Sequence, residues 1–485
     1  MSLRVLSRLD TARTQYCHFK AIIVAGMGLF TDAYHLFSIA PITTMLGYIY
    51  YDESPHHPIP HAVESAMLAV ALLGTAIGQL IFGRLGDLVG RRRLYGLALM
   101  LIMAGSIGCG FSMGISKGYI LASLGFFRFL LGVGIGGDYP LSATIMSEYA
   151  NKRMRGAFMA AIFSMQGFGI LASSVVTMVV CKIFGRSYPP SLNDPIPKKA
   201  DIAWRLILML GVIPAVMTFY WRMKMPETAR YTALVENNVL QATQDMERVL
   251  DMSDCQIAEG HCLQPSQSSY LLFSKQFFLL HGRNLLACSS TWFLLDIVFY
   301  SYPHLQSEIY FMSQHDKDTA DTVFDAAFKV ARLQAIMACS SMIPGCIAAF
   351  FLIDRIGRLI IQAVGFVLMA IVYFSIGVPY DRYWQHHPSA LFILYGLTSF
   401  FANCGPNTTT FILPAELFPA RFRTTCHGIA GAAGKAGAII GVVLMASLER
   451  RVTLIIWGGI CAAGMVGTSM FTKETRGTSL EENED

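Results

Sequence analysis

Apolar windows of roughly 20 residues recur along the whole chain, and each is long enough to cross a hydrocarbon core of about 30 Å as a helix. Backbone polar groups in lipid must be satisfied within the segment itself, which favours helices. The sequence therefore predicts an all-α polytopic membrane protein with twelve transmembrane helices. Their expected spans are 19–50, 61–85, 93–114, 118–148, 157–183, 202–224, 284–311, 327–353, 359–378, 388–417, 424–447 and 452–472.

Composition excludes several other classes of protein. Only 14% of the residues are charged, whereas a soluble domain has about 25%. The net charge of +5 comes from short loops between apolar spans, so we expect no nucleic-acid partner. The 11 cysteines include no C-x-x-C pair, so neither a disulfide framework nor a metal site is indicated. We also expect no cofactor, no enzyme activity and no cleaved signal peptide in the polar first eighteen residues.

Basic residues cluster in alternate loops, after spans 2, 4, 8 and 10. They are Arg84, Arg91, Arg92 and Arg93; Lys152, Arg153 and Arg155; Arg355 and Arg358; and Arg421 and Arg423. Because positive loops stay inside, these loops and both termini are predicted to be cytoplasmic. The loop after span 5 is an exception, since it contains Lys182, Arg186, Lys198 and Lys199. We follow the orientation that the other four loops indicate.

Two patterns occur once in each half of the chain. Asp87-Leu88-Val89-Gly90-Arg91 returns as Asp354-Arg355-Ile356-Gly357-Arg358, and the pair Glu148 and Arg155 returns as Glu416 and Arg423. Repeats of this kind indicate a duplicated six-helix unit. We therefore predict an N-terminal bundle at 1–224, a polar cytoplasmic linker at 225–283, a C-terminal bundle at 284–472 and a cytoplasmic tail at 473–485.

The loop after span 2, Gly83 to Arg93, resembles the signature of the major facilitator superfamily. Pro226-Glu227-Thr228-Ala229-Arg230 and Lys473-Glu474-Thr475-Arg476-Gly477 resemble segments that follow helices 6 and 12 in its sugar-porter-like members. The resemblance implies a conformational latch of charged pairs between the bundles. Its expected members are Asp87, Arg91, Glu148, Arg155, Asp354, Arg358, Glu416 and Arg423.

Polar side chains within the spans are candidates for function, because an ionisable residue at membrane depth is costly unless it is paired or lines water. Trp292, Asp296 and Tyr300 recur every four residues and so share one helical stripe. A break at Gly405-Pro406 lies beside Asn403 and Asn407. The other candidates are Asp32, His35, Arg128, Asp138, Tyr139, Gln166 and Lys435. Packing is the alternative for the aromatic residues, and contact between helices is the alternative for the amides.

A closer resemblance rests on the segment Gly136-Gly137-Asp138-Tyr139-Pro140-Leu141-Ser142 with Ser147-Glu148, which is similar to the phosphate:proton symporters of fungi and plants. Phe163 to Gly167, Trp292 to Tyr300, Gly405 to Phe411, and His427-Gly428 with Gly434 to Ala438 match the same family. The resemblance implies that phosphate contacts Tyr139, Gln166, Trp292, Asp296, Tyr300 and Asn407, with Lys435 close to the anion. It also implies that Asp32 and Asp138 carry protons.

Two departures from that family touch the proton route. His35 stands where members usually have a second aspartate, and Ala98 stands where many have a glutamate. We group His35 and Arg128 with the proton-coupling residues.

Dihydrogen phosphate both donates and accepts hydrogen bonds, so it suits a site of Tyr, Trp, Gln and Asn donors with one carboxylate acceptor. Sulfate has no proton for that carboxylate. The sequence thus predicts proton-coupled symport of inorganic phosphate, most naturally in a plasma membrane. The alternatives are a sugar or polyol symporter, a glycerophosphodiester symporter, and a transporter-like sensor that binds without carrying.

Overall fold

The computed structural model describes residues 16–51, 59–186, 198–236, 238, 240–242, 244, 270–313, 322–444 and 448–483. The middle of the predicted linker and the first fifteen residues lie outside these ranges. The helices of the first half are α2 (Tyr16–Phe37), α3 (Ile39–Tyr50), α4 (His61–Val89), α5 (Arg91–Gly110), α6 (Lys117–Tyr149), α7 (Arg155–Arg186), α8 (Lys198–Leu210), α9 (Val212–Lys224) and α10 (Ala229–Leu234).

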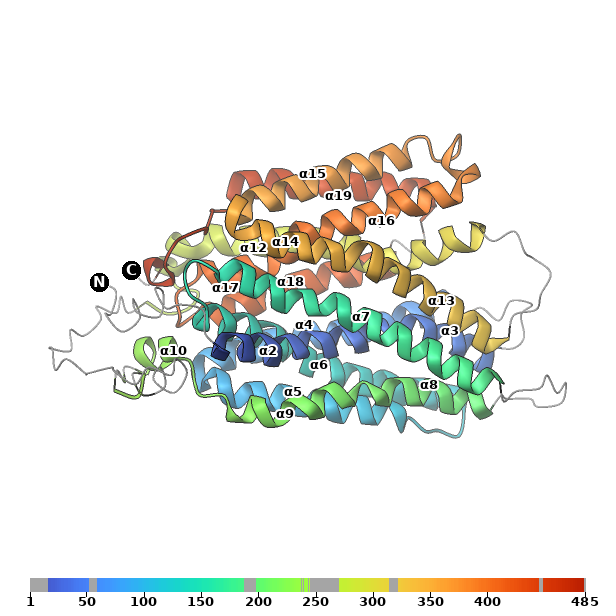
Figure 1. The fold of residues 1–485 in the computed structure, drawn as a ribbon, viewed down its shortest axis with the longest axis horizontal. Helices are drawn as coiled ribbons and strands as arrows, with labels where there is room; N and C mark the ends of the chain where they lie inside the picture. Colours follow the sequence, from blue (N-terminus) through green and yellow to red (C-terminus); the bar gives the residue numbers. More distant parts are fainter. Residues whose placement is uncertain are drawn as a thin grey trace.

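The second half contains a second set of long helices, as the duplication in the sequence predicts. They are α12 (Lys275–Ser313), α13 (Val323–Met337), the π-helix η1 (Ala338–Met342), α14 (Ile343–Ile356), α15 (Arg358–Gly377), η2 (Trp384–His386), α16 (Pro388–Cys404), α17 (Pro406–Leu417), α18 (Arg423–Leu444), α19 (Arg450–Phe471) and η4 (Leu480–Asn483). Figure 1 shows the long helices lying side by side along one axis, with α10 at one end. We call this end, where Gly90, Gly357 and α10 lie, the linker end.

Ten helical segments in the described ranges are long and apolar enough to cross a membrane. The other two predicted spans correspond to α12 and to the α16–α17 pair. The latter is divided at Gly405 into pieces of 17 and 12 residues, because Pro406 cannot donate the backbone hydrogen bond that a continuous helix needs. The twelve-helix prediction is confirmed in this form.

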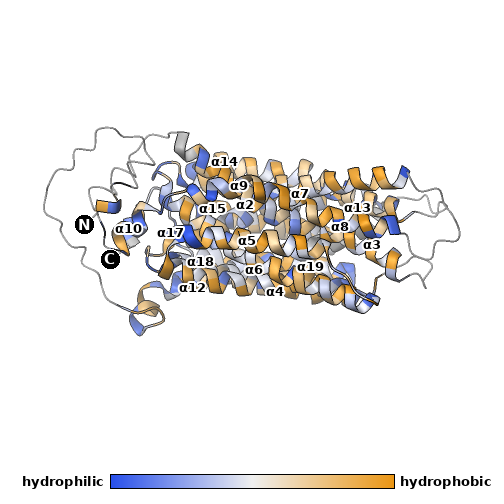
Figure 2. Ribbon diagram, turned by 90° about the horizontal axis from the view of Figure 1, so that it is seen from below, coloured by the Kyte–Doolittle hydropathy of each residue, from blue (hydrophilic) through white to orange (hydrophobic). Residues whose placement is uncertain are grey.

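Large apolar side chains face outward along the helices, as lipid-facing residues do. Leu73 and Leu80 on α4, Met217 on α9 and Phe351 on α14 are all exposed. Figure 2 shows hydrophobic colour over the helical shaft and hydrophilic colour gathering toward its ends. The molecule therefore presents a lipid-compatible belt and keeps its polar groups inside or at the ends.

The two halves meet closely along α4 and α18. A Cβ atom at Gly428 of α18 would overlap the backbone oxygen of Gln79 on α4. Small residues at such crossings let two backbones approach, as is typical of helices in membranes. This close crossing places α18, which carries Lys435, against the first half of the chain.

The turns at Gly90 and Gly357 occupy matching places in the repeat. Gly90 has φ 101° and Gly357 has φ 108°, a region that residues with a Cβ rarely adopt. Each turn joins two long helices, α4 to α5 and α14 to α15. The repeated D-x-x-G-R pattern thus corresponds to a repeated backbone turn.

Candidate functional site

Lys435 is the centre of a buried polar cluster between the two halves. Its Nζ donates to Asp296 Oδ2 at 2.8 Å and to the Tyr300 hydroxyl at 2.9 Å. The ammonium also lies 4.3 Å from the ring centroid of Tyr300 and 5.6 Å from that of Tyr139. Asp296 and Lys435 are both almost fully buried. The structure therefore brings together residues of α6, α12 and α18 that are up to 296 positions apart (Tyr139 and Lys435).

Close packing of α12 against α18 positions this cluster. Trp292 lies one turn before Asp296 on α12, and a Cβ atom at Gly434 would lie 2.5 Å from its ring. The Trp292 ring also meets His427 edge to face, with centroids 5.5 Å apart. Glycine next to Lys435 is thus what allows the indole and the ammonium to share one surface. The three residues of the predicted stripe, Trp292, Asp296 and Tyr300, lie on one helix, α12.

Aromatic rings from both halves close the cluster on its sides. Phe411 of α17 contacts Tyr139 with centroids 6.2 Å apart and Phe163 of α7 with centroids 5.2 Å apart. On the side away from the linker end, Phe37 of α2 stacks on Tyr300 at 6.2 Å. These rings exclude water, so the Lys435–Asp296 pair lies in a region of low dielectric.

The two predicted amide ligands lie on the same helices as these rings. Gln166 is three residues from Phe163 on α7, and its buried Oε1 has no hydrogen-bond partner. Asn407 is four residues before Phe411, and its amide donates to Asn403 Oδ1 at 2.9 Å. Gln79 of α4, which the sequence reasoning missed, is fully buried at the crossing with α18, and both its amide atoms lack partners. The sequence shows only a polar residue inside the apolar span 61–85, and its position opposite α18 is visible only in the structure.

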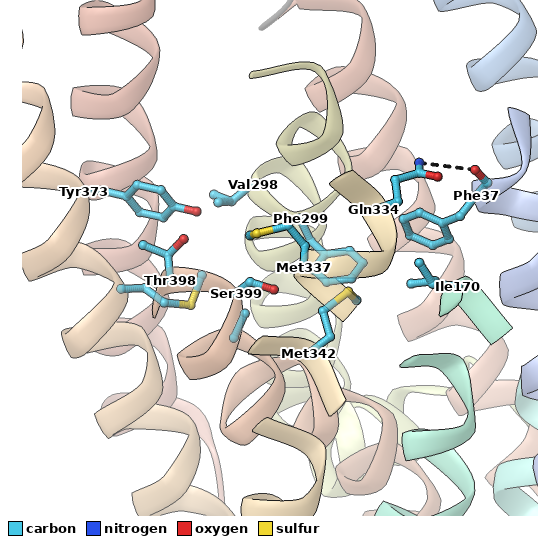
Figure 3. A pocket seen from close by; sticks show the side chains of 12 residues that line it. Phe37, Ile170, Val298, Phe299, Gln334, Met337, Met342, Tyr373, Thr398 and Ser399 are labelled. Atoms are coloured by element: carbon cyan, nitrogen blue, oxygen red, sulfur yellow. Dashed lines mark hydrogen bonds between the residues drawn. The ribbon is translucent and has the colours of Figure 1, made fainter. Parts of the chain in front are cut away.

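A small cavity of about 30 Å³ lies beyond Tyr300, toward the end opposite the linker end. Figure 3 shows Phe37 and Ile170 on one side of it, Tyr373 and Thr398 on the other, and Phe299 between them. Gln334 donates from its amide to the backbone oxygen of Phe37 at 3.3 Å, which ties the second half to the first. The cavity has room for about one water molecule, so it is too small for a phosphate ion.

A second buried cluster contains the two predicted proton-coupling carboxylates. Arg222 of α9 donates to both oxygens of Asp138, at 2.6 and 3.0 Å. Asp32 is fully buried beside Asp138 and Arg222, with which it interacts electrostatically, and no described N–H or O–H group donates to its two oxygens. Sequence reasoning missed Arg222, because it lies in the last turn of a span, where a basic residue ordinarily anchors at the interface. Only burial distinguishes it from the exposed Lys224.

His35 and Arg128 lie on the same side of the first half. The His35 ring is fully buried against the backbone of Gly211, and Nη1 of Arg128 is buried without a hydrogen-bond partner. Arg128 Nε donates to the backbone oxygen of Met67 at 3.1 Å. The two side chains interact electrostatically. Arg128 has no acidic hydrogen-bond partner among the described residues.

Charged pairs of both halves close the linker end. Arg91 lies 3.4 Å from Asp87 and 3.2 Å from Glu148, and Arg423 of the second half lies 2.8 Å from the same Glu148. Asp87 also accepts from the backbone N–H of Thr424 and Thr425, at 3.2 and 2.8 Å. A carboxylate at the first turn of α18 is favoured by the helix dipole.

The second half repeats this arrangement. Arg358 lies 2.9 Å from Asp354 and 2.8 Å from Glu416. Asp354 accepts from the backbone N–H of Ala157, in the first turn of α7, at 2.7 Å. Arg155, an expected member of the latch, donates to the backbone oxygen of Thr478, in the segment after α19, at 3.1 Å. A carboxylate of each half therefore caps a helix of the other half: Asp87 caps α18 and Asp354 caps α7.

Two further carboxylates belong to this network, from the segments after α9 and α19. Glu227 accepts from the backbone N–H of Arg91 and Arg92, and Glu474 accepts from those of Arg358 and Leu359. Their neighbours Thr228 and Thr475 donate to Glu148 and Glu416.

Comparisons with known proteins agree with this architecture. Residues 21–485 match the family described as sugar (and other) transporter. The chain is 56% identical to the probable inorganic phosphate transporter 1-9 of Arabidopsis thaliana, over 100% of this chain and 96% of that one. It is 53% identical to the probable inorganic phosphate transporter 1-10 of rice, Oryza sativa subsp. japonica, over 99% and 92%. The solved proton:xylose symporter XylE superposes with a TM-score of 0.70 at 19% identity, covering 96% of this chain and 98% of that one.

Proposed function

Because this chain belongs to the sugar (and other) transporter family and has the major facilitator fold, we propose that it carries inorganic phosphate together with protons. Relatives named probable inorganic phosphate transporters match it at 56% identity over 96% and 95% of their own length. The observation that carries the proposal is the buried ammonium of Lys435 between Asp296, Tyr300 and Tyr139.

This cluster has the chemistry that dihydrogen phosphate requires. Lys435 supplies positive charge, the tyrosine hydroxyls and the Trp292 indole N–H donate to phosphate oxygens, and Asp296 accepts from a P–OH group. Gln166 and Asn407 extend the same surface with amide groups. A neutral sugar could hydrogen-bond to the ammonium and the carboxylate, but it has no negative charge for the ammonium to attract. Sulfate would place an unprotonated oxygen against Asp296, which is repulsive.

Alternating access supplies the transport step. The linker end, which we assign to the cytoplasmic side of a plasma membrane, is closed by the pairs that join Glu148 to Arg423 and Asp87 to the first turn of α18. Opening toward the cytoplasm separates these contacts as one six-helix unit moves against the other around the central site. The expected division of the chain into bundles 1–224 and 284–472 with a linker between them belongs to this proposal.

Uptake of labelled phosphate by cells that lack their own phosphate carriers tests the substrate. Unlabelled phosphate and arsenate are expected to compete for uptake, whereas sulfate and glucose are not. An uncoupler should abolish accumulation. Inhibition by glucose as strong as that by phosphate would refute the assignment and favour a sugar symporter.

A further inference from the structure

The two carboxyl groups of the proton-coupling cluster are not equivalent in the structure. Asp138 forms a bidentate ion pair with Arg222, and both side chains are fully buried. Asp32 is just as buried, yet its two oxygens accept no hydrogen bond from any described residue. An ionised carboxylate without a partner is very unfavourable in such a place, whereas a neutral carboxyl group is tolerated. The geometry thus separates a charged aspartate from a neutral one.

Arg222 is held in place by residues from three other helices. Its guanidinium lies 4.0 Å from the ring centroid of Tyr95 on α5. The Tyr95 hydroxyl lies 2.9 Å from Ser142 of α6, one turn after Asp138. A Cβ atom at Gly28 of α2 would overlap both Arg222 Nη2 and Asp138 Oδ2. The glycine on α2 therefore makes room for this ion pair next to Asp32.

We propose that Arg222 is a positioning residue of proton coupling, which keeps Asp138 ionised so that the transported proton is carried by Asp32. This inference rests on the proposed function. In the structure seen here the cluster is neutral overall, with one carboxylate, one guanidinium and one carboxyl group. On release, the O–H bond of Asp32 breaks, the proton passes to water, and the electron pair stays on the Asp32 carboxylate, next to the Asp138–Arg222 pair.

The position of Asp32 also links the proton to the substrate. The groups that act electrostatically on Asp32 or Arg222 from the surrounding helices are Asp138, Tyr95, Tyr139 and Tyr300. Tyr139 and Tyr300 belong to the Lys435 cluster. A negative charge that appears on Asp32 therefore repels an anion bound between these tyrosines, so loss of the proton favours loss of phosphate.

Neutralising substitutions distinguish this assignment from one in which Asp138 carries the proton. Asp138→Asn alone leaves Arg222 without a partner, and Asp32 then becomes its counter-ion and is held ionised. Arg222→Gln alone leaves Asp138 without a counter-charge and creates a second proton-binding carboxyl group. In the double variant Arg222→Gln/Asp138→Asn the two charges next to Asp32, which act on it in opposite directions, are removed together. Asp32 can therefore still bind and release a proton.

The experiment measures pH-driven phosphate accumulation and, separately, phosphate exchange without a gradient, in proteoliposomes of the purified full chain. Each single variant is expected to keep exchange but to shift the pH of half-maximal accumulation by more than about one unit, a tenfold change in proton affinity. The double variant should return toward the wild-type pH profile, and adding Asp32→Asn should abolish accumulation. Lys224→Gln, which removes an exposed cation two residues away, is the matched control and should have no effect.

A double variant that exchanges phosphate but never accumulates it would overturn the proposal, as would a wild-type pH profile in Arg222→Gln. If Arg222→Gln is too unstable to purify, the double variant alone decides, because it removes both charges together. Absence of phosphate exchange in the wild-type protein would instead refute the proposed function, so the two failures are distinguishable.

Discussion

At the scale of single residues, the candidate site depends on charges that are buried and paired. Lys435 neutralises Asp296, and Arg222 neutralises Asp138. Removing one partner of a buried ion pair leaves the other charge uncompensated and costs about 3–5 kcal/mol, whereas removing both can be nearly neutral. Single and double substitutions therefore separate a residue's contribution to stability from its contribution to transport.

For the phosphate site, Lys435→Ala is expected to lower both thermal stability in detergent and uptake. The double variant Lys435→Ala/Asp296→Asn should regain most of the stability and still transport no phosphate, since the ammonium and the acceptor are both gone. Matched substitution of the exposed pair Arg451 and Asp381, 50% and 59% exposed, should change stability by less than about 1 kcal/mol. Phosphate uptake by the double variant at the wild-type rate would exclude this pair from the site.

His35 gives a different expectation, because it lies one turn from Asp32 and outside the Lys435 cluster. Its ring is fully buried one turn from Asp32 and interacts with Arg128, so it is placed to exchange a proton or to influence one. His35→Ala should shift the pH optimum of uptake and leave the KM for phosphate unchanged. A pH series of initial rates checks both quantities. A large rise in KM with no change in pH optimum would assign His35 to phosphate binding instead.

At the scale of helices and turns, much of the fold was predictable, since periodic apolar windows and repeated turn motifs are local in sequence. The stripe on α12 and the break before α17 follow directly from residue spacing. Arg222 and Gln79 could not be found in this way, because burial between helices depends on packing that no local pattern records. The partners of Glu148 also came partly from the other half of the chain.

The turns at Gly90 and Gly357 give a prediction at this scale. Alanine at either position would need a backbone conformation that costs about 1–3 kcal/mol, and its Cβ would press against Glu227 or Glu474. Both Gly90→Ala and Gly357→Ala should therefore lower the melting temperature in detergent. Gly459→Ala, in α19 with no atom within 4 Å of the added Cβ, is the control and should not. Equal effects at all three sites would contradict the role of the turns.

At the scale of the whole molecule, the last described segment bridges the two halves. Arg155 donates to Thr478, and Arg230 pairs with Glu481 at 2.9 Å. Burial alone would raise the pKa of Glu481, but Arg230 and the hydrogen bond from Ser479 outweigh it and lower this pKa from 4.5 to about 2. A group whose pKa is lowered on folding stabilises the fold above its unfolded value. The contact is thus complete above about pH 4.5 and is lost as the pH falls toward 2.

Digestion by pepsin, which acts throughout this range, checks the docking of the tail. We expect the peptide bonds next to the buried Leu480 to resist cleavage at pH 5 and to become sensitive to it as the pH approaches 2. Glu481→Gln should be cleaved already at pH 5. An unstructured peptide of the same sequence corrects for the pH dependence of pepsin itself. Rapid cleavage of the wild-type chain at pH 5 would show that the tail is not held by this pair.

Proton-driven phosphate transport by the whole molecule is the central claim, and purified protein in proteoliposomes tests it most directly. With the outside acidic and the inside alkaline, we predict that labelled phosphate accumulates above its external concentration. We also predict that an uncoupler collapses this accumulation, and that Lys435→Ala/Asp296→Asn shows none. Accumulation of glucose or xylose in place of phosphate, or phosphate accumulation that ignores the proton gradient, would contradict the account.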